Sequence, residues 1–260
     1  MIIYRRIFGN VNNLVIKQEL EDILRTKVDQ GYFSIDLDEA SEQYKKMEGF
    51  ILKNSFYHDV IGTRFTKQEI DTAEVLCFLG APSFAYPEPQ EPAYLNATYA
   101  DVCHKCGIYG DQKADFVIRK DIRLSKNKLA SLHWVFGELF CDIDIYDSFF
   151  KSKLPFRSLE IKGGNKSDFI RQFVLPELQR GLELSHLSQE ICDECGRIKY
   201  SPTIIGFFPL PKQVDFFIAK TKEFFGSGHS AYQKILVSNV AMKELIKHKL
   251  AKQHQFAPCR

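Results

Sequence analysis

Two short cysteine motifs constrain this chain more than any other feature. Their sequences are Cys-His-Lys-Cys-Gly at residues 103–107 and Cys-Asp-Glu-Cys-Gly at residues 192–196, and we call each of them a knuckle. Two residues between the cysteines allow one tight turn to direct both sulfur atoms at the same point. The glycine that follows can adopt a positive φ angle, which folds the backbone around the sulfurs. Together the knuckles offer four thiolates, the number of ligands in a closed tetrahedral zinc site.

The sequence therefore predicts one structural Zn²⁺ ion. Its expected ligands are Cys103, Cys106, Cys192 and Cys195. The chain between the knuckles is several times longer than the roughly 15–20 residues of a compact zinc ribbon, so we expect a ribbon with a long insertion. Two alternatives stay open: two sites that other ligands complete, or no metal. Four thiolates leave no bound water to activate, so this zinc should hold the fold rather than catalyse a reaction.

A redox role for the knuckles is less well supported. Redox Cys-x-x-Cys pairs usually open a helix, which lowers the pKa of the first thiol. Gly107 and Gly196 disfavour a helix at that point. His104 lies inside the first knuckle, and we interpret it as a solvent-facing spacer rather than a metal ligand.

The bulk composition is that of an ordinary folded protein. Hydrophobic residues make up 45% of the 260 residues, and the formal net charge of +2 is too small to indicate a nucleic-acid or membrane partner. No segment approaches the roughly 20 apolar residues of a membrane span, and the first residues do not resemble a signal peptide. Seven cysteines, four of them in knuckles, suit a metal site in a reducing cytoplasm better than a disulfide framework.

The first part of the chain predicts an α+β region that ends near residue 98. We expect a strand at 1–8, a short amphipathic helix at 17–27, a helix that starts near Thr66 and a buried strand at 75–79. Thr66 and Glu69 form a capping-box pattern, which supports the second helix. Four prolines between residues 81 and 92 predict a stretch without regular structure and mark the domain boundary.

The second part, residues 99–260, contains two degenerate repeats, at about 99–162 and about 188–260. Each repeat consists of a knuckle, strands, a capped helix and a final strand. The expected strands are at 115–119, 132–136, 203–208 and 216–219, and the segment 169–184 between the repeats is expected to be helical.

One alignment of the repeats places Phe140 on Leu236. Asp142 and Ser238 then fall at equivalent positions, directly before a helical segment. Each side chain can accept a hydrogen bond from the first turn of its helix, so both are predicted N-caps. Cys77 and Cys141 have no local partner pattern, and we expect them to pack as small hydrophobic residues.

The sequence contains no linear signature of an enzyme. We find no phosphate-binding loop, no dinucleotide-binding glycine motif and no zinc-protease motif. The segment around Ser227 lacks the first glycine of a nucleophile elbow, because Phe225 stands at that position. His133 is interpreted as a buried histidine, and we predict no catalytic residue and no enzymatic activity.

Nucleic-acid binding is the alternative function. Residues 119–128 and 243–252 are rich in lysine and arginine, and zinc ribbons often bind nucleic acid. Asp121 and Glu244 interrupt the two basic segments, and a solvated helix face explains the second of them. A nucleic-acid-binding or regulatory zinc ribbon is therefore the second choice, and a hydrolase is the third.

The knuckles and the segments that follow them resemble the double-CXXCG motif proteins, a bacterial family. The matching residues are CHKCG at 103–107 and CDECG at 192–196, and ELFCDIDIYDSFF and ILVSNVAMKELI resemble the strand and capped helix of each half. The resemblance covers roughly residue 99 to the C-terminus. Many members carry proline or serine in the first knuckle, where this chain has His104-Lys105. Some members are similar to immunity proteins of toxin systems, so the resemblance implies a non-catalytic protein that binds a cognate toxin.

These observations predict a cytoplasmic α+β protein in which a four-cysteine zinc ribbon joins two strand and helix repeats. The N-terminal α+β region is expected to pack against the repeats. The protein is expected to act by binding another protein, in particular by neutralising a toxin. An interface of about 1,600 Å² with a few aromatic anchors is sufficient for tight inhibition.

Overall fold

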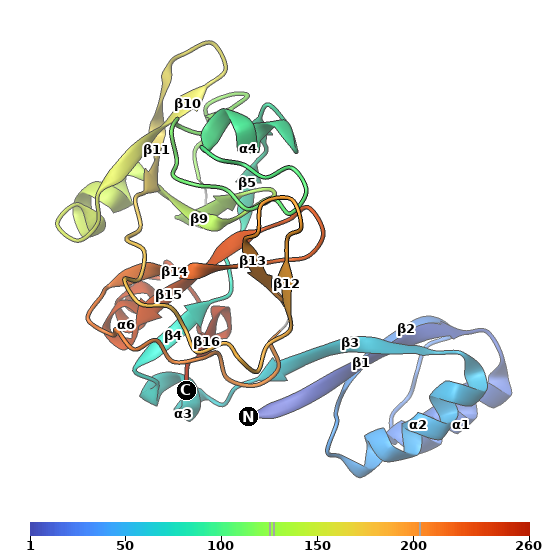
Figure 1. Cartoon of the computed structure of the whole chain (residues 1–260). Coiled ribbons are helices and arrows are strands. Elements are labelled where there is room, and N and C mark those ends of the chain that lie inside the picture. Colours follow the sequence, from blue (N-terminus) through green and yellow to red (C-terminus); the bar gives the residue numbers. More distant parts are fainter. Residues whose placement is uncertain (125, 127, 203) are drawn as a thin grey trace. The chain divides into compact units, whose positions relative to one another are not determined.

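The computed structural model describes residues 1–124, 126, 128–202 and 204–260, and these residues form two compact units (Figure 1). The smaller unit contains Met1–Glu69 and Ile204–Gly206, and the larger unit contains the other described residues. Both units are mixed α+β structures, and strands predominate in the larger unit. The first division falls after Glu69, whereas the sequence placed it near residue 98. The reason is that a strand at residues 75–78 pairs with strands close to the C-terminus.

The smaller unit is a three-stranded sheet with two helices on one face (Figure 1). Its elements are β1 (Ile2–Val11), α1 (Leu14–Leu24), β2 (Gly31–Asp38), α2 (Glu42–Asn54) and β3 (Tyr57–Arg64). β1 lies between β2 and β3 and pairs antiparallel with both. The core between sheet and helices contains Ile7, Val11, Phe33 and Leu37 from the strands and Leu20, Met47 and Phe50 from the helices. The strand predicted at 1–8 is confirmed as β1.

Side-chain caps set the start of both helices. Asn13 accepts a hydrogen bond from the backbone N–H of Val15 at 2.8 Å, and Ser41 accepts one from Tyr44 at 3.1 Å. Because Asn13 starts α1 at Leu14, this helix begins before the predicted range of 17–27. It also ends early, at Leu24, because Arg25 adopts a left-handed conformation with a φ of 55°.

The predicted capping box before α3 (Lys67–Thr72) is confirmed. The carboxylate of Glu69 accepts a hydrogen bond from the Thr66 backbone N–H at 2.8 Å, and the Thr66 hydroxyl accepts one from the Glu69 N–H at 3.2 Å. These reciprocal bonds satisfy two backbone donors that the first turn of a helix leaves unpaired.

The larger unit contains two sheets. The first has the strand order β5-β8-β9-β11-β10-β7-β6, and the second has the order β12-β13-β14-β15-β4-β16. The strands of the first sheet are β5 (Ser83–Ala85), β6 (Pro87–Glu88), β7 (Val117–Ile118), β8 (Leu129–Leu132), β9 (Val135–Asp142), β10 (Phe156–Ile161) and β11 (Lys166–Phe173). Those of the second are β4 (Val75–Phe78), β12 (Gln189–Ile191), β13 (Ile198–Tyr200), β14 (Ile218–Phe225), β15 (Tyr232–Ser238) and β16 (Phe256–Pro258). The helical segments are α4 (Ala93–Thr98), α5 (Ile143–Ile145) with the π-helical turn η1 (Tyr146–Phe150), α6 (Asn239–Lys247) and the 3₁₀ turn η2 (Gln253–Gln255).

Several sequence predictions for this unit are wrong. The helix predicted at 169–184 is absent, because β11 occupies its first part in the centre of the first sheet. The proline-rich segment 81–92, predicted to lack regular structure, contains two short strands, β5 and β6, at the edges of the sheet. Proline has no backbone N–H, and edge strands tolerate this loss because only one of their sides is paired. The strand predicted at 132–136 is divided by a two-residue turn at His133 and Trp134. The strand predicted at 203–208 begins outside the described residues, and residues 204–207 form no strand.

Both sheets contain the same succession of elements. A strand and its antiparallel neighbour lead into a capped helical segment and then a final strand: β8, β9, α5 and β10 in one sheet, and β14, β15, α6 and β16 in the other. In each sheet one further strand, β11 or β4, lies between the second and final strands.

The registers of the two sheets correspond as well. Phe140 and Leu236, which the sequence alignment places at equivalent positions, each pair with an alanine on the preceding strand: Ala130 and Ala219. The predicted caps are confirmed. Asp142 accepts a hydrogen bond from the N–H of Asp144 at 3.2 Å, and Ser238 accepts one from Ala241 at 3.2 Å.

The sheets meet where β9 contacts β15. The rings of Phe136 and Tyr232 lie 5.2 Å apart, and a Cβ atom on Gly137 would lie 3.2 Å from the carbonyl oxygen of Gln233. In the alignment that places Phe140 on Leu236, each of these residues faces its own counterpart. Such pairing is the property of a two-fold axis, so the two halves pack as a pseudo-symmetric pair.

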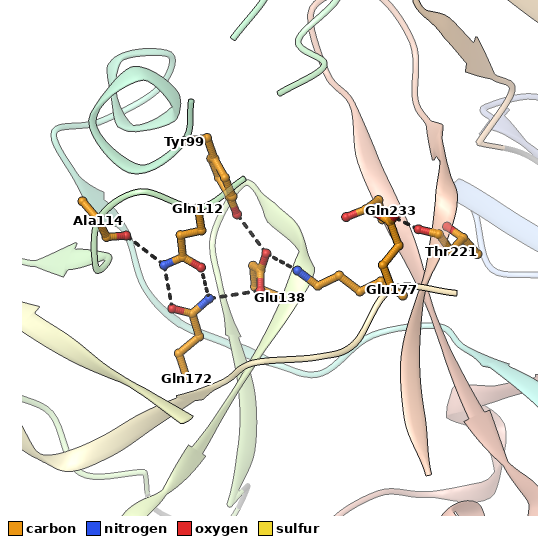
Figure 2. Close-up of polar contacts among 9 residues, drawn as sticks. Tyr99, Gln112, Ala114, Glu138, Gln172, Glu177, Thr221 and Gln233 are labelled. Atoms are coloured by element: carbon orange, nitrogen blue, oxygen red, sulfur yellow. Dashed lines mark hydrogen bonds and ion pairs between the residues drawn. The ribbon is translucent and has the colours of Figure 1, made fainter. Parts of the chain in front are cut away.

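A buried polar network also joins the sheets (Figure 2). Glu138 of β9 is 2% exposed, and its carboxylate accepts hydrogen bonds from Tyr99 Oη at 3.0 Å and Gln172 Nε2 at 3.1 Å. It also forms an ion pair with Lys220 of β14, in the other sheet. The amides of Gln112 and Gln172 exchange two further hydrogen bonds, at 3.0 and 2.7 Å. A buried carboxylate requires this degree of pairing.

Replacing Lys220 with methionine should destabilise the protein by about 3–5 kcal/mol, because Glu138 would remain buried without its cation. Urea denaturation measures the change. The double variant K220M/E138Q should recover part of the loss, since the amide stays neutral and still accepts from Tyr99. Lys222→Met, an exposed position on the same strand, is the control and should change stability by less than about 0.5 kcal/mol. Equal stability of K220M and K222M would contradict this role for the ion pair.

Candidate metal centre

The two knuckles have the same local structure. In the first, the N–H of Gly107 donates to the carbonyl of Cys103 at 2.8 Å, and in the second the N–H of Gly196 donates to Cys192 at 2.8 Å. Each glycine has a positive φ, +76° for Gly107 and +70° for Gly196, a conformation that residues with a Cβ atom rarely adopt. The short-range sequence pattern thus determines the turn that directs each pair of sulfurs.

The fold brings all four predicted ligands together. The Sγ atoms of Cys103, Cys106, Cys192 and Cys195 all lie within 4.8 Å of one another. The sulfurs of Cys103 and Cys192 are 3.8 Å apart, and those of Cys106 and Cys195 are 3.7 Å apart. A tetrahedral zinc site with Zn–S bonds of about 2.3 Å requires S···S distances of about 3.8 Å. Disulfide sulfurs would lie about 2.05 Å apart, and all four cysteines are free thiols.

The site is closed by its surroundings. Cys103, Cys106 and Cys192 are buried, and Cys195 is partly buried. They pack with Ile108 in a small apolar cluster. His104 does not join the four sulfurs, and its carbonyl oxygen instead lies 3.1 Å from Nδ1 of His229. Four converging sulfurs complete a tetrahedral shell, so the arrangement suits a structural ion rather than a catalytic one.

The other cysteines lie elsewhere in the larger unit. Cys77 and Cys141 are buried in β4 and β9, as predicted. Burial raises the pKa of the Cys77 thiol to about 11 and that of the Cys141 thiol still further. Both therefore stay neutral at physiological pH and behave as small hydrophobic residues.

Two cations next to the site were not found by sequence reasoning. Arg197 donates a hydrogen bond from Nε to the Cys195 sulfur at 3.4 Å. Lys199 is 1% exposed, and its Nζ donates to the carbonyl oxygen of Cys106 at 3.1 Å. The sequence gives only a weak indication of this role. Two cations at alternate positions are also the pattern of an ordinary exposed strand.

The thiols differ in their electrostatic environment. The hydrogen bond from Arg197 lowers the pKa of the Cys195 thiol to about 6, whereas burial raises the pKa of the Cys106 thiol to about 12. Some of these groups are therefore neutral thiols at pH 7 unless a metal replaces the proton. On the surface, Lys105 and Asp193 form an ion pair of 2.7 Å between the knuckles, an exposed contact that contributes little to stability.

Comparison of the chain with protein-family models, with curated proteins and with solved structures returned no match. In the part of the chain that the structure describes, no helix has both the length and the apolar character that crossing a membrane requires.

The glycines of the two knuckles offer a matched pair of substitutions. Both have left-handed φ angles, but a Cβ atom on Gly107 would lie 2.0 Å from the carbonyl oxygen of His229, whereas no atom lies within 4 Å of one on Gly196. We expect Gly107→Ala to destabilise the protein clearly more than Gly196→Ala, which carries only the backbone strain of about 1 kcal/mol. Thermal unfolding of both variants measures the difference, and equal losses would show that the loop around His229 relaxes.

Proposed function

We propose that Cys103, Cys106, Cys192 and Cys195 bind one structural Zn²⁺ ion and form a zinc ribbon with a long insertion. The observation that carries this proposal is the convergence of four sulfurs at tetrahedral spacing. Four thiolates select soft, tetrahedral ions, for which zinc and iron are the usual biological candidates. Zinc is the proposed ion because it has no redox chemistry and suits a buried site that holds the fold.

Replacing Cys192 with serine should abolish tight zinc binding and lower stability strongly, because zinc binding at such sites is coupled to folding. Elemental analysis of the purified protein should give one zinc per wild-type chain and substantially less for the variant. Cys141→Ala is the matched control, since it removes a buried thiol away from the site and should retain the metal. Undiminished zinc and unchanged stability in C192S would overturn the proposal.

With its metal shell closed, the protein is proposed to act by binding another protein rather than by catalysis. The resemblance of the knuckles to double-CXXCG proteins supports a bacterial toxin as that partner and an immunity function for this chain. The smaller unit offers a surface that suits such a role. Helices cover one face of its sheet, and the opposite face carries the exposed side chains of Tyr32 and Tyr57.

The chemistry of this helix-free face favours a protein partner. The rings of Phe8 and Tyr57 stack at 5.3 Å, and the guanidinium of Arg64 lies 4.6 Å from the centre of the Tyr4 ring. Tyrosine and arginine are enriched among the residues that dominate protein interfaces.

The charges of the same face also favour a protein partner. Arg6 and Arg64 both pair with Asp36, at 2.7 and 2.5 Å, which leaves this triad with one net positive charge. An acidic group on a partner protein would complement it. A nucleic-acid backbone is disfavoured by the carboxylate at the centre of the triad.

Alanine substitution of Tyr32 and Tyr57 together should weaken binding to the cognate toxin by at least about tenfold, the effect of losing interface hot spots. The partner to be tested is a toxin encoded beside this gene, and the readouts are calorimetric titration and rescue of growth on co-expression. Leu52→Ala is the control, because Leu52 is 80% exposed on the helical side of the unit. Wild-type protein that neither binds nor rescues would refute the toxin partner. Salt-dependent binding to bulk DNA or RNA would favour the nucleic-acid alternative instead.

A further inference from the structure

Lys199 is buried without a close carboxylate. Its side chain is 1% exposed, yet among the described residues the one carboxylate within 4.0 Å belongs to Glu190, at 3.9 Å and with its side chain 63% exposed. The ammonium instead donates to two backbone carbonyls, of Cys106 at 3.1 Å and of Gly228 at 2.6 Å. Lysine is almost never fully buried unless it is paired, because removing an ammonium from water is costly.

Arg197 has a similar environment. Its Nη2 donates to the carbonyls of Asp101 at 2.8 Å and Ile108 at 3.0 Å, and its Nε donates to the Cys195 sulfur. Within the described part of the chain, Arg197 forms no ion pair with a carboxylate. The two cations thus lie in similar environments. Each contacts a knuckle, and neither has a strong carboxylate partner.

The local structure explains how both side chains reach the same place. β13 begins directly after the second knuckle, and residues at alternate positions of a strand point to the same side. Arg197 and Lys199 are two residues apart, while Ile198 between them is exposed. Arg197, directly before β13, donates to the carbonyls of Asp101 and Ile108 on either side of the first knuckle, and Lys199, within β13, donates to the carbonyl of Cys106 in that knuckle.

We propose that Arg197 and Lys199 are positioning residues that neutralise a doubly negative metal centre. Four thiolates around one divalent ion carry a net charge of −2, which two adjacent cations offset. This inference rests on the proposed zinc site and deepens it, because it explains one buried and one partly buried cation that the ligands alone do not.

The two cations have different tasks. Lys199 provides charge and holds the backbone of Cys106, so its loss should weaken metal binding while leaving the sulfur donors electronically unchanged. Arg197 also donates a hydrogen bond to a ligand sulfur. Its N–H group draws electron density from that sulfur, so its loss should alter the metal–thiolate bond itself. Residues around the ligands of metal sites typically change metal affinity by about 10–100-fold.

The test uses the full-length chain and the variants R197M, R197K and K199M. Lys105→Met is the control, because Lys105 is an exposed cation within a knuckle whose ion pair is on the surface. Zinc affinity is measured by competition with a chromogenic chelator, and the thiolate-to-metal charge-transfer bands are recorded after substitution with Co²⁺. Circular dichroism verifies that each variant is folded.

We expect R197M and K199M to lose about 10–100-fold in zinc affinity, whereas K105M should stay within about twofold of wild type. The Co²⁺ charge-transfer bands should shift in R197M, and R197K should restore affinity partly, because it keeps the charge but loses the sulfur geometry. If K199M does not fold, the difference in zinc affinity between R197M and K105M tests the proposal.

Unchanged affinity and an unchanged Co²⁺ spectrum in R197M, with zinc bound by the wild type, would overturn the role of the cations and leave the zinc site standing. Wild-type protein that binds neither Zn²⁺ nor Co²⁺ would overturn both proposals.

Discussion

The meeting of four sulfur atoms from two distant segments is the contact that joins the two cysteine knuckles of the larger unit. The second knuckle lies in a hairpin of two three-residue strands, β12 and β13, and all three residues of β12 are exposed. So short a hairpin cannot bury a core of its own. The cysteine cluster supplies what the hairpin lacks, since Cys192 packs against Cys103 and Cys106 of the first knuckle and against the adjacent Ile108. A metal bond at this point would act in place of a hydrophobic core.

The same pairing rule extends from the knuckles to the sheets. Cys103 faces Cys192 and Cys106 faces Cys195, as residues at equivalent positions do across a two-fold axis. β9 and β15 meet in the same way. The buried ion pair between Glu138 and Lys220 departs from this symmetry, because the position equivalent to Glu138 in the other sheet holds Lys234 rather than a carboxylate. Two similar halves can associate in more than one way, and a single buried pair of opposite charges favours one arrangement over the others.

The environment of the charged groups differs between the cysteine cluster and the proposed binding face of the smaller unit. Around the sulfurs, the cations Arg197 and Lys199 donate hydrogen bonds to backbone carbonyls and to the Cys195 sulfur. On the helix-free face of the smaller unit, Arg6 and Arg64 are solvent-accessible and lie among tyrosines. Charged groups of the first kind hold a buried centre together, whereas those of the second kind can be exchanged for contacts with another molecule.

The sequence by itself determined the features whose causes lie within a few residues. The glycine turns, the caps Asp142 and Ser238 and the capping box of Thr66 and Glu69 all depend on bonds spanning at most five residues. Tertiary structure alone decided that residues 166–173 form β11 rather than a helix, because pairing with β9 and β10 outweighs local propensity. It also decided the partners of Glu138 and Lys199. Those contacts join residues 82 and 93 positions apart, and local propensity or periodicity along the chain carries no information about which distant groups the fold will bring together.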